Sequence, residues 1–151
     1  MSGHGHATMS PPPSTAPTFV LRPIGHVESI LTDPASAPRQ GDEGAPDASL
    51  EIEADMWAGC ADLRPGDEII VLTWLHRAER DQLVVRPRDD PARTLTGVFS
   101  TRSADRPNPI GLHHIRVLAI DATTILVSGL EALDRTPILD IKPIVGQLSD
   151  R

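Results

Sequence analysis

Two segments of the chain concentrate side chains that can hold charge or move a proton. The segment at 97–112 reads GVFSTRSADRPNPIGL and carries Arg102, Arg106 and Asn108 beside two prolines. Proline fixes its own φ and pushes the residue before it towards extended backbone, so this run holds polar groups at a low entropy cost. Such stiffness suits a binding site, but a rigid surface turn would have the same composition.

The second segment, at 130–143, reads LEALDRTPILDIKP. Successive side chains of a strand point to opposite faces, so Asp140 and Lys142 share one face, with Leu139 and Ile141 on the other. The pair can combine a carboxylate base with an ammonium that stabilises negative charge. It can also be a surface ion pair, which is the commoner outcome for two such residues.

Histidine and cysteine give little support to a metal centre. His113 and His114 are adjacent, and adjacent residues of a strand face opposite ways. The single cysteine, Cys60, excludes an internal disulfide and a cysteine-rich zinc site. We therefore expect no metal.

His76 and Arg77 follow the apolar run at 69–75. Polar groups just beyond the end of a strand are well placed for a binding site.

The 151 residues carry a net charge of −7, but the charge is unevenly distributed. Residues 41–68 hold nine acidic residues against one arginine, whereas residues 76–116 hold eight arginines against five acidic residues. Overall acidity argues against tight nonspecific binding of a polyanion. An arginine-rich face can still contact a few phosphates, or its charges can simply be solvated. The chain has no Gly-rich phosphate loop before a helix, so a nucleotide-like cofactor would not use a Rossmann-type loop.

Short β-rich runs separated by proline and glycine predict a mainly β domain. We expect a small antiparallel β-barrel with one or two short helices and long loops, because a doubly wound sheet needs more helices. The predicted organisation is a disordered N-terminal tail at 1–18, the barrel domain at 19–146 and a C-terminal tail at 147–151. No segment is apolar enough to span a membrane and no basic secretory start is present, so we expect a cytoplasmic protein.

Individual elements follow from the same patterns. The predicted helix is 55–63, capped by Asp55 and followed by the turn at 64–67. The apolar run at 68–75 predicts a buried central strand, with 82–86 as its neighbour. Residues 32–49 predict a long polar loop. The remaining predicted strands are 19–27, 50–52, 94–101, 115–120, 124–129 and 136–144, with a tight turn at 121–123.

Five segments together resemble the TsaA/TrmO family, the S-adenosylmethionine-dependent tRNA threonylcarbamoyladenosine methyltransferases. The resemblance covers about residues 19–145, and its long central motif is specific. The chain differs from the family in having Arg135 where glycine is usual and Ile144 where an aromatic often follows, and longer members carry a C-terminal domain. The matching segments are IGHVES at 24–29, APRQ at 37–40, VLTWLHR at 71–77, GVFSTRSADRPNPIGL at 97–112 and LEALDRTPILDIKP at 130–143.

The resemblance implies a barrel fold, a homodimer with cofactor sites near the subunit interface, and S-adenosyl-L-methionine as the methyl donor. It implies methylation of the exocyclic nitrogen of threonylcarbamoyladenosine next to the anticodon of tRNA. The segments matching the family's cofactor contacts are Pro38, Arg39, Gln40, His76, Arg77, Arg102, Leu112, Leu130, Glu131, Ala132, Leu133 and Asp134.

Roles for the remaining polar residues follow as a hypothesis. Asp140 would accept the proton of the target nitrogen, and Lys142 would hold the developing negative charge. Arg102, Arg106 and Asn108 would bind a carboxylate or a phosphate of the substrate or cofactor. Two alternatives remain: a methyltransferase of the same fold acting on a small molecule or another RNA, and a module that binds S-adenosylmethionine or RNA without chemistry.

Overall fold

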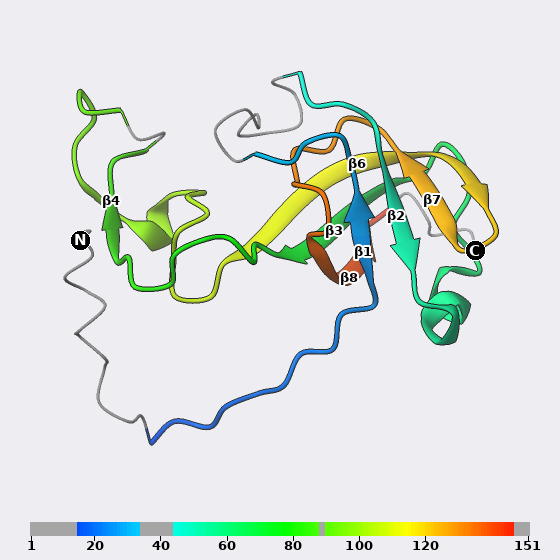
Figure 1. The fold of residues 1–151 in the computed structure, drawn as a ribbon, viewed down its shortest axis with the longest axis horizontal. Helices are drawn as coiled ribbons and strands as arrows, with labels where there is room; N and C mark the ends of the chain where they lie inside the picture. The colour runs from blue at the N-terminus through cyan, green and yellow to red at the C-terminus, as the bar shows by residue number, and fades with distance from the viewer. Residues whose placement is uncertain (1–14, 34–43, 88–89, 147–151) are drawn as a thin grey trace.

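The computed structural model describes residues 15–33, 44–87 and 90–146, and the strands of its main sheet close on themselves (Figure 1). The hydrogen-bonded order is β1-β2-β7-β6-β3-β8 and back to β1, with every pair antiparallel. A separate two-stranded sheet pairs β4 with β5. The elements are β1 Gly25–Glu28, β2 Ala48–Ile52, the 3-10 helix η4 Ala54–Cys60, β3 Glu68–Trp74, β4 Val84–Val85, β5 Thr96–Gly97, the 3-10 helix η6 Val98–Ser100, β6 Ile110–Asp121, β7 Thr124–Val127 and β8 Pro137–Pro143.

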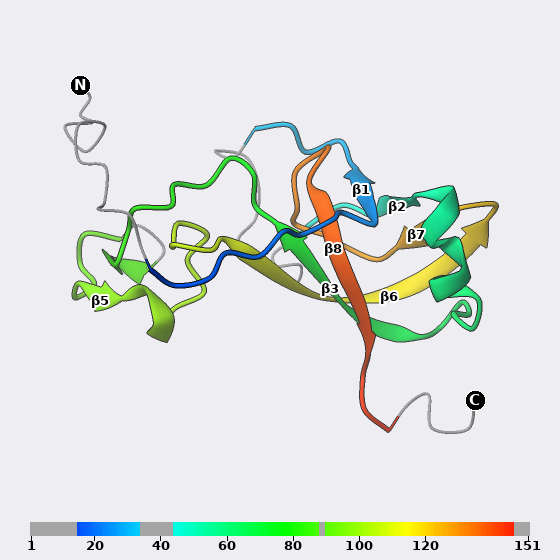
Figure 2. The ribbon, with the colours of Figure 1, turned by 90° about the horizontal axis from the view of Figure 1, so that it is seen from below.

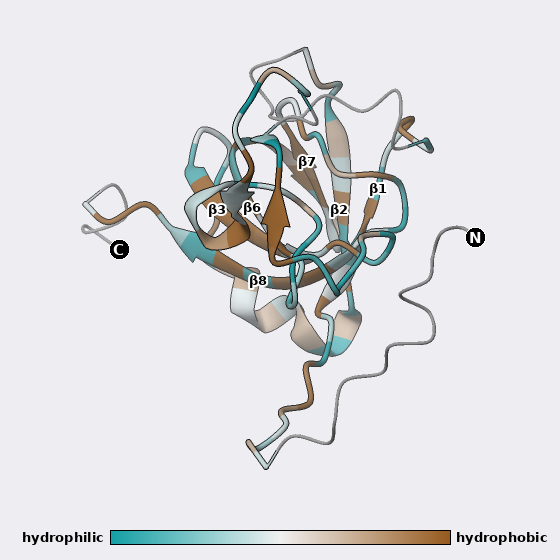
Figure 3. Cartoon of the chain, turned by 90° about the vertical axis from the view of Figure 1, so that its left-hand side faces the viewer, coloured by the Kyte–Doolittle hydropathy of each residue, from teal (hydrophilic) through white to brown (hydrophobic). Residues whose placement is uncertain are grey.

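The barrel is filled by the apolar side chains that alternate along its strands. Along β3, and along β6 as far as Val117, every second residue is buried, and the inward residues include Ile69, Val71 and Ile115. This period-2 alternation is what a strand with one buried face requires. The hydrophobic colour accordingly concentrates on the strands in Figure 3. The predicted mainly β barrel is confirmed.

The seam between β1 and β8 is the shortest pairing of the barrel. Gly25 pairs with Ile138 and His26 with Pro137, and Val27 N donates to Thr136 O at 2.9 Å. Gly25 must be glycine, because a Cβ there would overlap the backbone carbonyl oxygen of Glu51 on β2. The pairing of β1 with its other neighbour, β2, therefore depends on one close approach of two backbones.

The segment after β3 leaves the barrel and forms an arm that carries β4, β5 and η6 (Figures 1 and 2). The prediction that 82–86 lies beside the central strand is wrong. Strand β3 is already flanked by β6 and β8, and β4 pairs with β5 instead. The predicted strand at 94–101 is shortened to β5, because η6 begins directly after it. Local apolar composition indicated strands here but not their partners.

Two predictions at the N-terminal side are also corrected. The predicted strand at 19–27 is limited to β1 at its end, and Phe19 is 84% exposed. The predicted helix at 55–63 is the 3-10 helix η4, whose N-cap is Glu53 without a side-chain hydrogen bond. Asp55 does not cap it, because its carboxylate pairs with the guanidinium of Arg22 at 2.5 Å.

Both predicted turns are present. Asp67 accepts the Arg64 backbone N–H at 2.9 Å, and Gly66 between them has a φ of +97°. The β6–β7 hairpin closes with Asp121 opposite Thr124 and Ala122 at a φ of +53°. No helix in residues 15–33, 44–87 and 90–146 is long and apolar enough to cross a membrane. Most of the predicted tail at 1–18 and the tail at 147–151 lie outside the described residues.

Candidate functional site

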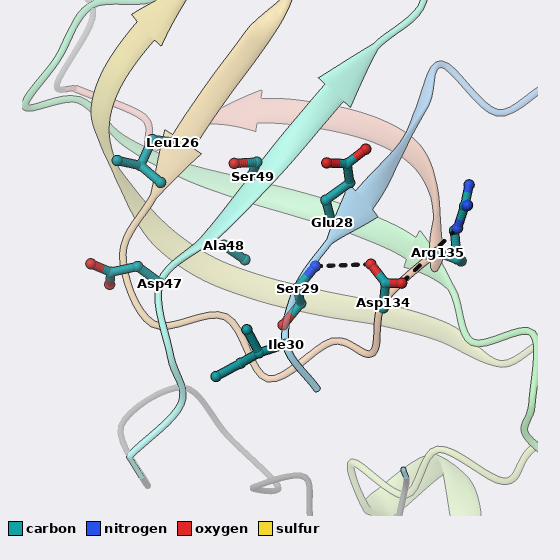
Figure 4. Close-up of a pocket in the computed structure, with 9 residues that line it drawn as sticks. All are labelled: Glu28, Ser29, Ile30, Asp47, Ala48, Ser49, Leu126, Asp134 and Arg135. Atoms are coloured by element: carbon teal, nitrogen blue, oxygen red, sulfur yellow. Dashed lines mark hydrogen bonds and ion pairs between the residues drawn. The ribbon is translucent and has the colours of Figure 1, made fainter. Parts of the chain in front are cut away.

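The segment that follows β1 is tied to the predicted cofactor stretch at 130–134. The Ser29 backbone N–H donates to Asp134 Oδ1 at 3.0 Å (Figure 4), and the Asp134 backbone N–H donates to Leu31 O at 2.7 Å. Ser29 Oγ accepts the Leu31 N–H at 3.1 Å. These reciprocal bonds fix the IGHVES motif against the LEALD motif, although about a hundred residues separate them in sequence.

A third predicted segment meets the same place. Arg77 Nη1 donates to Thr32 O at 2.8 Å, so the end of the VLTWLHR motif contacts the residue directly after Leu31. His76 and Arg77 are exposed. The predicted contacts Pro38, Arg39 and Gln40 lie outside the described residues, and the 29–32 segment leads towards them in the chain. The structure therefore joins two of the segments assigned to the cofactor, 76–77 and 130–134, through the segment that follows β1.

A hollow of about 450 Å³ opens beside Asp134 on the outer side of β1, β2 and β7 (Figure 4). Its carboxylates come from Glu28, Asp47 and Asp134, and Arg135 supplies the opposing charge, so the lining is acidic. Arg135 has a φ of +73°, a conformation that glycine adopts freely and other residues at a cost. The chain thus keeps a glycine-type turn here with arginine in place. The lining residues are Glu28, Ser29, Ile30, Asp47, Ala48, Ser49, Leu126, Asp134 and Arg135.

Within the 130–134 stretch, the side chains divide between the core and the site. Leu130 and Ala132 are buried in the barrel core, so only their backbone can meet a ligand. Leu130 N–H donates to Pro46 O at 2.9 Å, which anchors the start of the stretch. Glu131, Leu133 and Asp134 are partly exposed. The predicted roles of these five residues stay predictions, and the geometry favours Glu131 and Asp134 for side-chain contacts.

A buried polar chain beneath this stretch was missed by the sequence analysis. His113 Nδ1 lies 2.5 Å from Glu131 Oε1, and His113 Nε2 lies 2.7 Å from Thr73 Oγ1. His113 and Thr73 are 5% and 0% exposed. The sequence held one signal for this residue, the alternation of inward and outward positions along a strand. His113 lies at an inward position between Gly111 and Ile115, where an apolar residue is expected.

The arm loop at 101–109 uses one of its predicted ligand residues to hold itself together. Arg106 Nε donates to Ser103 O at 2.8 Å, and its Nη2 donates to Val98 O at 2.7 Å and to Thr101 O. A guanidinium that donates to the carbonyl oxygens of its own loop has fewer N–H groups left to bind a ligand. The prediction that Arg106 binds substrate stays a prediction, and its contacts favour a loop-holding role.

The other two polar residues of that loop differ from each other. Asn108 Oδ1 accepts a hydrogen bond from Arg80 Nη2 at 3.3 Å, and that guanidinium stacks 4.9 Å from the Trp74 ring centroid. Arg102 is exposed and makes no hydrogen bond to another residue in the described part of the chain. Arg102 therefore presents its whole guanidinium for a carboxylate or phosphate.

Asp140 and Lys142 share the outer face of β8, as predicted, and form an ion pair at 2.9 Å. Asp140 lies opposite Leu72 on β3, which in turn lies opposite Leu112 on β6. The predicted base and the predicted cofactor contact Leu112 thus lie in one row, two strands apart. Leu112 is 45% exposed, and both charged side chains are about half exposed.

The row does not extend directly into the arm loop. Among the described residues, no hydrogen bond or ion pair joins Asp140 or Lys142 to Arg102, Arg106 or Asn108. The link is through the backbone: Leu75, just past β3, donates its N–H to Pro109 O at 2.8 Å. The proline-rich loop therefore adjoins the C-terminal end of β3, whereas Asp140 and Lys142 lie beside Leu72 and Ile70 within that strand.

Cys60 contributes no nucleophile. Its thiol is buried in the core, and burial raises the pKa of that thiol above its usual value. The nucleophilic form of cysteine is the thiolate, so Cys60 stays protonated at neutral pH.

Comparison with known proteins identifies the family. The model of the tRNA-methyltransferase O N-terminal domain matches residues 26–150 of the chain. The chain belongs to this family. Among solved structures, TrmO from Pseudomonas aeruginosa superposes with a TM-score of 0.67 at 30% identity, over 89% of this chain and 60% of that one.

Curated relatives of this TrmO-type domain are named for a ligand. A protein of Archaeoglobus fulgidus named S-adenosyl-L-methionine-binding protein is 40% identical over 125 residues, covering 82% of this chain and 88% of its own length. A second protein of the same organism, named a probable S-adenosyl-L-methionine-binding protein, is 42% identical over 123 residues. The match covers 82% of this chain but only 33% of the length of that relative. The TrmO-type domain thus occurs in proteins both of its own size and much longer.

Proposed function

We propose that this domain binds S-adenosyl-L-methionine and transfers its methyl group to the exocyclic nitrogen of threonylcarbamoyladenosine in tRNA. The observation that carries the proposal is the meeting of the 29–32, 76–77 and 130–134 segments in a chain of the TrmO family. The 76–77 and 130–134 segments match cofactor-contacting segments of that family, and residue 29 ends its opening motif at 24–29.

The residues present suit this ligand. S-adenosyl-L-methionine carries an ammonium, a sulfonium, ribose hydroxyls and a carboxylate. The carboxylates of Glu131 and Asp134 suit the cationic groups and the hydroxyls, and Glu131 Oε2 accepts no hydrogen bond from another described residue. The guanidinium groups of Arg77 and Arg102 are exposed and suit the carboxylate.

In this proposal the bound donor supplies an activated methyl group, and the protein aligns the acceptor and removes a proton. A new N–C bond forms as the C–S bond breaks, and the bonding electron pair stays on sulfur. The proton of the target nitrogen passes to Asp140, which the Lys142 ammonium keeps oriented at 2.9 Å. Lys142 also stabilises the negative charge that develops on the substrate.

The first test is transfer of a labelled methyl group to bulk tRNA, with and without the threonylcarbamoyl modification. We expect label only in the modified tRNA. Label in unmodified RNA or in a small molecule would replace the substrate assignment. Binding of S-adenosylmethionine without transfer to any RNA would identify a non-catalytic binding module.

The role of Asp140 is tested by Asp140→Asn. We expect loss of methyl transfer with an S-adenosylmethionine dissociation constant within about twofold of wild type, because the amide accepts no proton at neutral pH. The control is Asp121→Asn, an exposed carboxylate at the end of β6, which leaves both quantities unchanged. Loss of cofactor affinity in Asp140→Asn would move this residue from proton transfer to binding.

A further inference from the structure

The buried chain from Thr73 through His113 to Glu131 links the barrel interior to the proposed cofactor site. Thr73 comes from β3, His113 from β6 and Glu131 from the stretch before β8. The side chains of His113 and Glu131 are 4% and 15% exposed. Of these three side chains, only that of Glu131 reaches the surface. His113 and Thr73 can therefore affect a bound ligand only through the Glu131 carboxylate.

The carboxylate decides which ring nitrogen of His113 donates to it. Glu131 is an acceptor when ionised, so His113 Nδ1 donates to its Oε1. The other ring nitrogen, Nε2, shares a hydrogen bond with the Thr73 hydroxyl, which can donate or accept. In this arrangement no buried side-chain polar atom of the described residues lacks a partner. Each hydrogen bond in the chain fixes the next group.

Gly111 makes room for this arrangement. A Cβ on Gly111 would overlap Thr73 Oγ1, and would lie 2.8 Å from His113 Nε2 and 3.1 Å from Leu75 Cδ2. Any larger residue at this position would separate the hydroxyl from the ring. Gly111, the second glycine of the 97–112 motif, thus has a packing reason that its backbone angles do not supply.

The hydrogen-bonded side chains of Thr73, His113 and Glu131 do not form a nucleophilic triad, although their residue types resemble one. Thr73 is completely buried, so no substrate carbon can approach its hydroxyl. The exposed edge lies at the opposite end, on Glu131. His113 holds one carboxylate oxygen, Oε1, and the other, Oε2, accepts no hydrogen bond from another described residue.

We propose that His113, itself oriented by Thr73, is a positioning residue that fixes the Glu131 carboxylate for hydroxyl or ammonium groups of S-adenosylmethionine. This inference rests on the proposed function, since it presumes a cofactor at the 130–134 stretch. Glu131 sits between Leu130 and Ala132, whose side chains anchor the backbone in the core. The backbone is therefore held by packing and the carboxylate by the histidine. Preorganising an acceptor in this way removes part of the entropy cost of binding.

The experiment compares S-adenosylmethionine affinity by calorimetry and thermal stability for His113→Leu and its matched control His114→Leu. His114 is the next residue of β6, faces outward and pairs with Glu68 at 2.8 Å. We expect His113→Leu to weaken binding about tenfold, the size of a lost charge-assisted hydrogen bond, and His114→Leu to bind like wild type.

Two further variants separate positioning from general destabilisation. Thr73→Val removes the hydroxyl at nearly constant shape and should weaken binding, whereas Thr73→Ser retains the hydroxyl and should restore wild-type affinity. Glu131→Gln alone should weaken binding, and adding His113→Leu to it should cause no further loss, because the histidine acts only through Glu131. If His113→Leu fails to fold, the Thr73 pair and Glu131→Gln still decide the question.

The outcomes are distinct. Wild-type protein that binds no S-adenosylmethionine overturns the proposed function and this inference with it. Wild-type binding with unchanged affinity in His113→Leu or Thr73→Val overturns the inference alone. Equal losses in Thr73→Val and Thr73→Ser, or additive losses for His113 and Glu131, assign these residues to folding only and also overturn it.

Discussion

Two cationic or titratable side chains of this domain are used in ways that their residue types do not reveal. Arg106 stands in the most specific motif of the sequence, yet its guanidinium donates to the carbonyls of Ser103, Val98 and Thr101. His113 stands next to an exposed histidine but is buried against Glu131. At this scale the free guanidinium of Arg102 is the better candidate for binding an anionic group.

The protonation of His113 can be measured directly. The hydrogen-bond network places a ring proton on Nδ1, because Nδ1 faces a carboxylate. We expect long-range 1H–15N NMR at neutral pH to show a protonated Nδ1. A ring with its proton on Nε2 alone would contradict this assignment, since two acceptors would then face each other at 2.5 Å.

At the scale of elements, the function of the domain depends on where β1 and β8 close the ring. The segment after β1 carries Ser29 and Leu31 to the site, and β8 carries Asp140 and Lys142. Closure allows these segments from opposite ends of the chain to lie on one small scaffold. On its other side β1 must stay paired with β2, and that pairing depends on the close approach at Gly25.

Gly25→Ala tests this dependence. We expect the free energy of unfolding to fall by about 1–3 kcal/mol, because the added Cβ overlaps the Glu51 carbonyl and the strands must separate. Gly59→Ala in η4 is the matched control, since a Cβ there meets nothing within 4 Å, and we expect a change within about 0.5 kcal/mol. Chemical denaturation measures both, and equal effects would show that the β1–β2 pairing tolerates a wider spacing.

At the scale of the whole molecule, the arginine-rich and acidic regions meet where Arg116 pairs with Glu68. The arm with β4 and β5 nevertheless lies at one end of the long axis, and η4 lies at the other (Figure 1). The arginine-rich sequence at 76–116 builds the arm and β6, whereas the acidic sequence at 41–68 builds β2 and η4. An RNA approaching the arm would therefore meet arginines before it meets the acidic end.

The homodimer implied by the family resemblance is a prediction at this same scale. Leu112 and Ile110 are 45% and 43% exposed on the outer face of β6, where a second chain could cover them. Leu112 is also one of the predicted cofactor contacts. We expect sedimentation equilibrium to give a mass near twice the 16.3 kDa of one chain. A mass of one chain at micromolar concentration would contradict it and would require each cofactor site to be complete within a single chain.

The sequence by itself determined the family, the barrel class, the central strand, both tight turns and the shared face of Asp140 and Lys142. These depend on local information, namely the period-2 alternation of apolar residues, turn residues and motifs, which needs no knowledge of distant contacts. The tertiary structure alone decided that β4 pairs with β5, that Arg106 holds its own loop, and that Thr73, His113 and Glu131 form one chain. Each of these depends on which strands become neighbours when the sheet closes, and the energy of that closure belongs to no single segment.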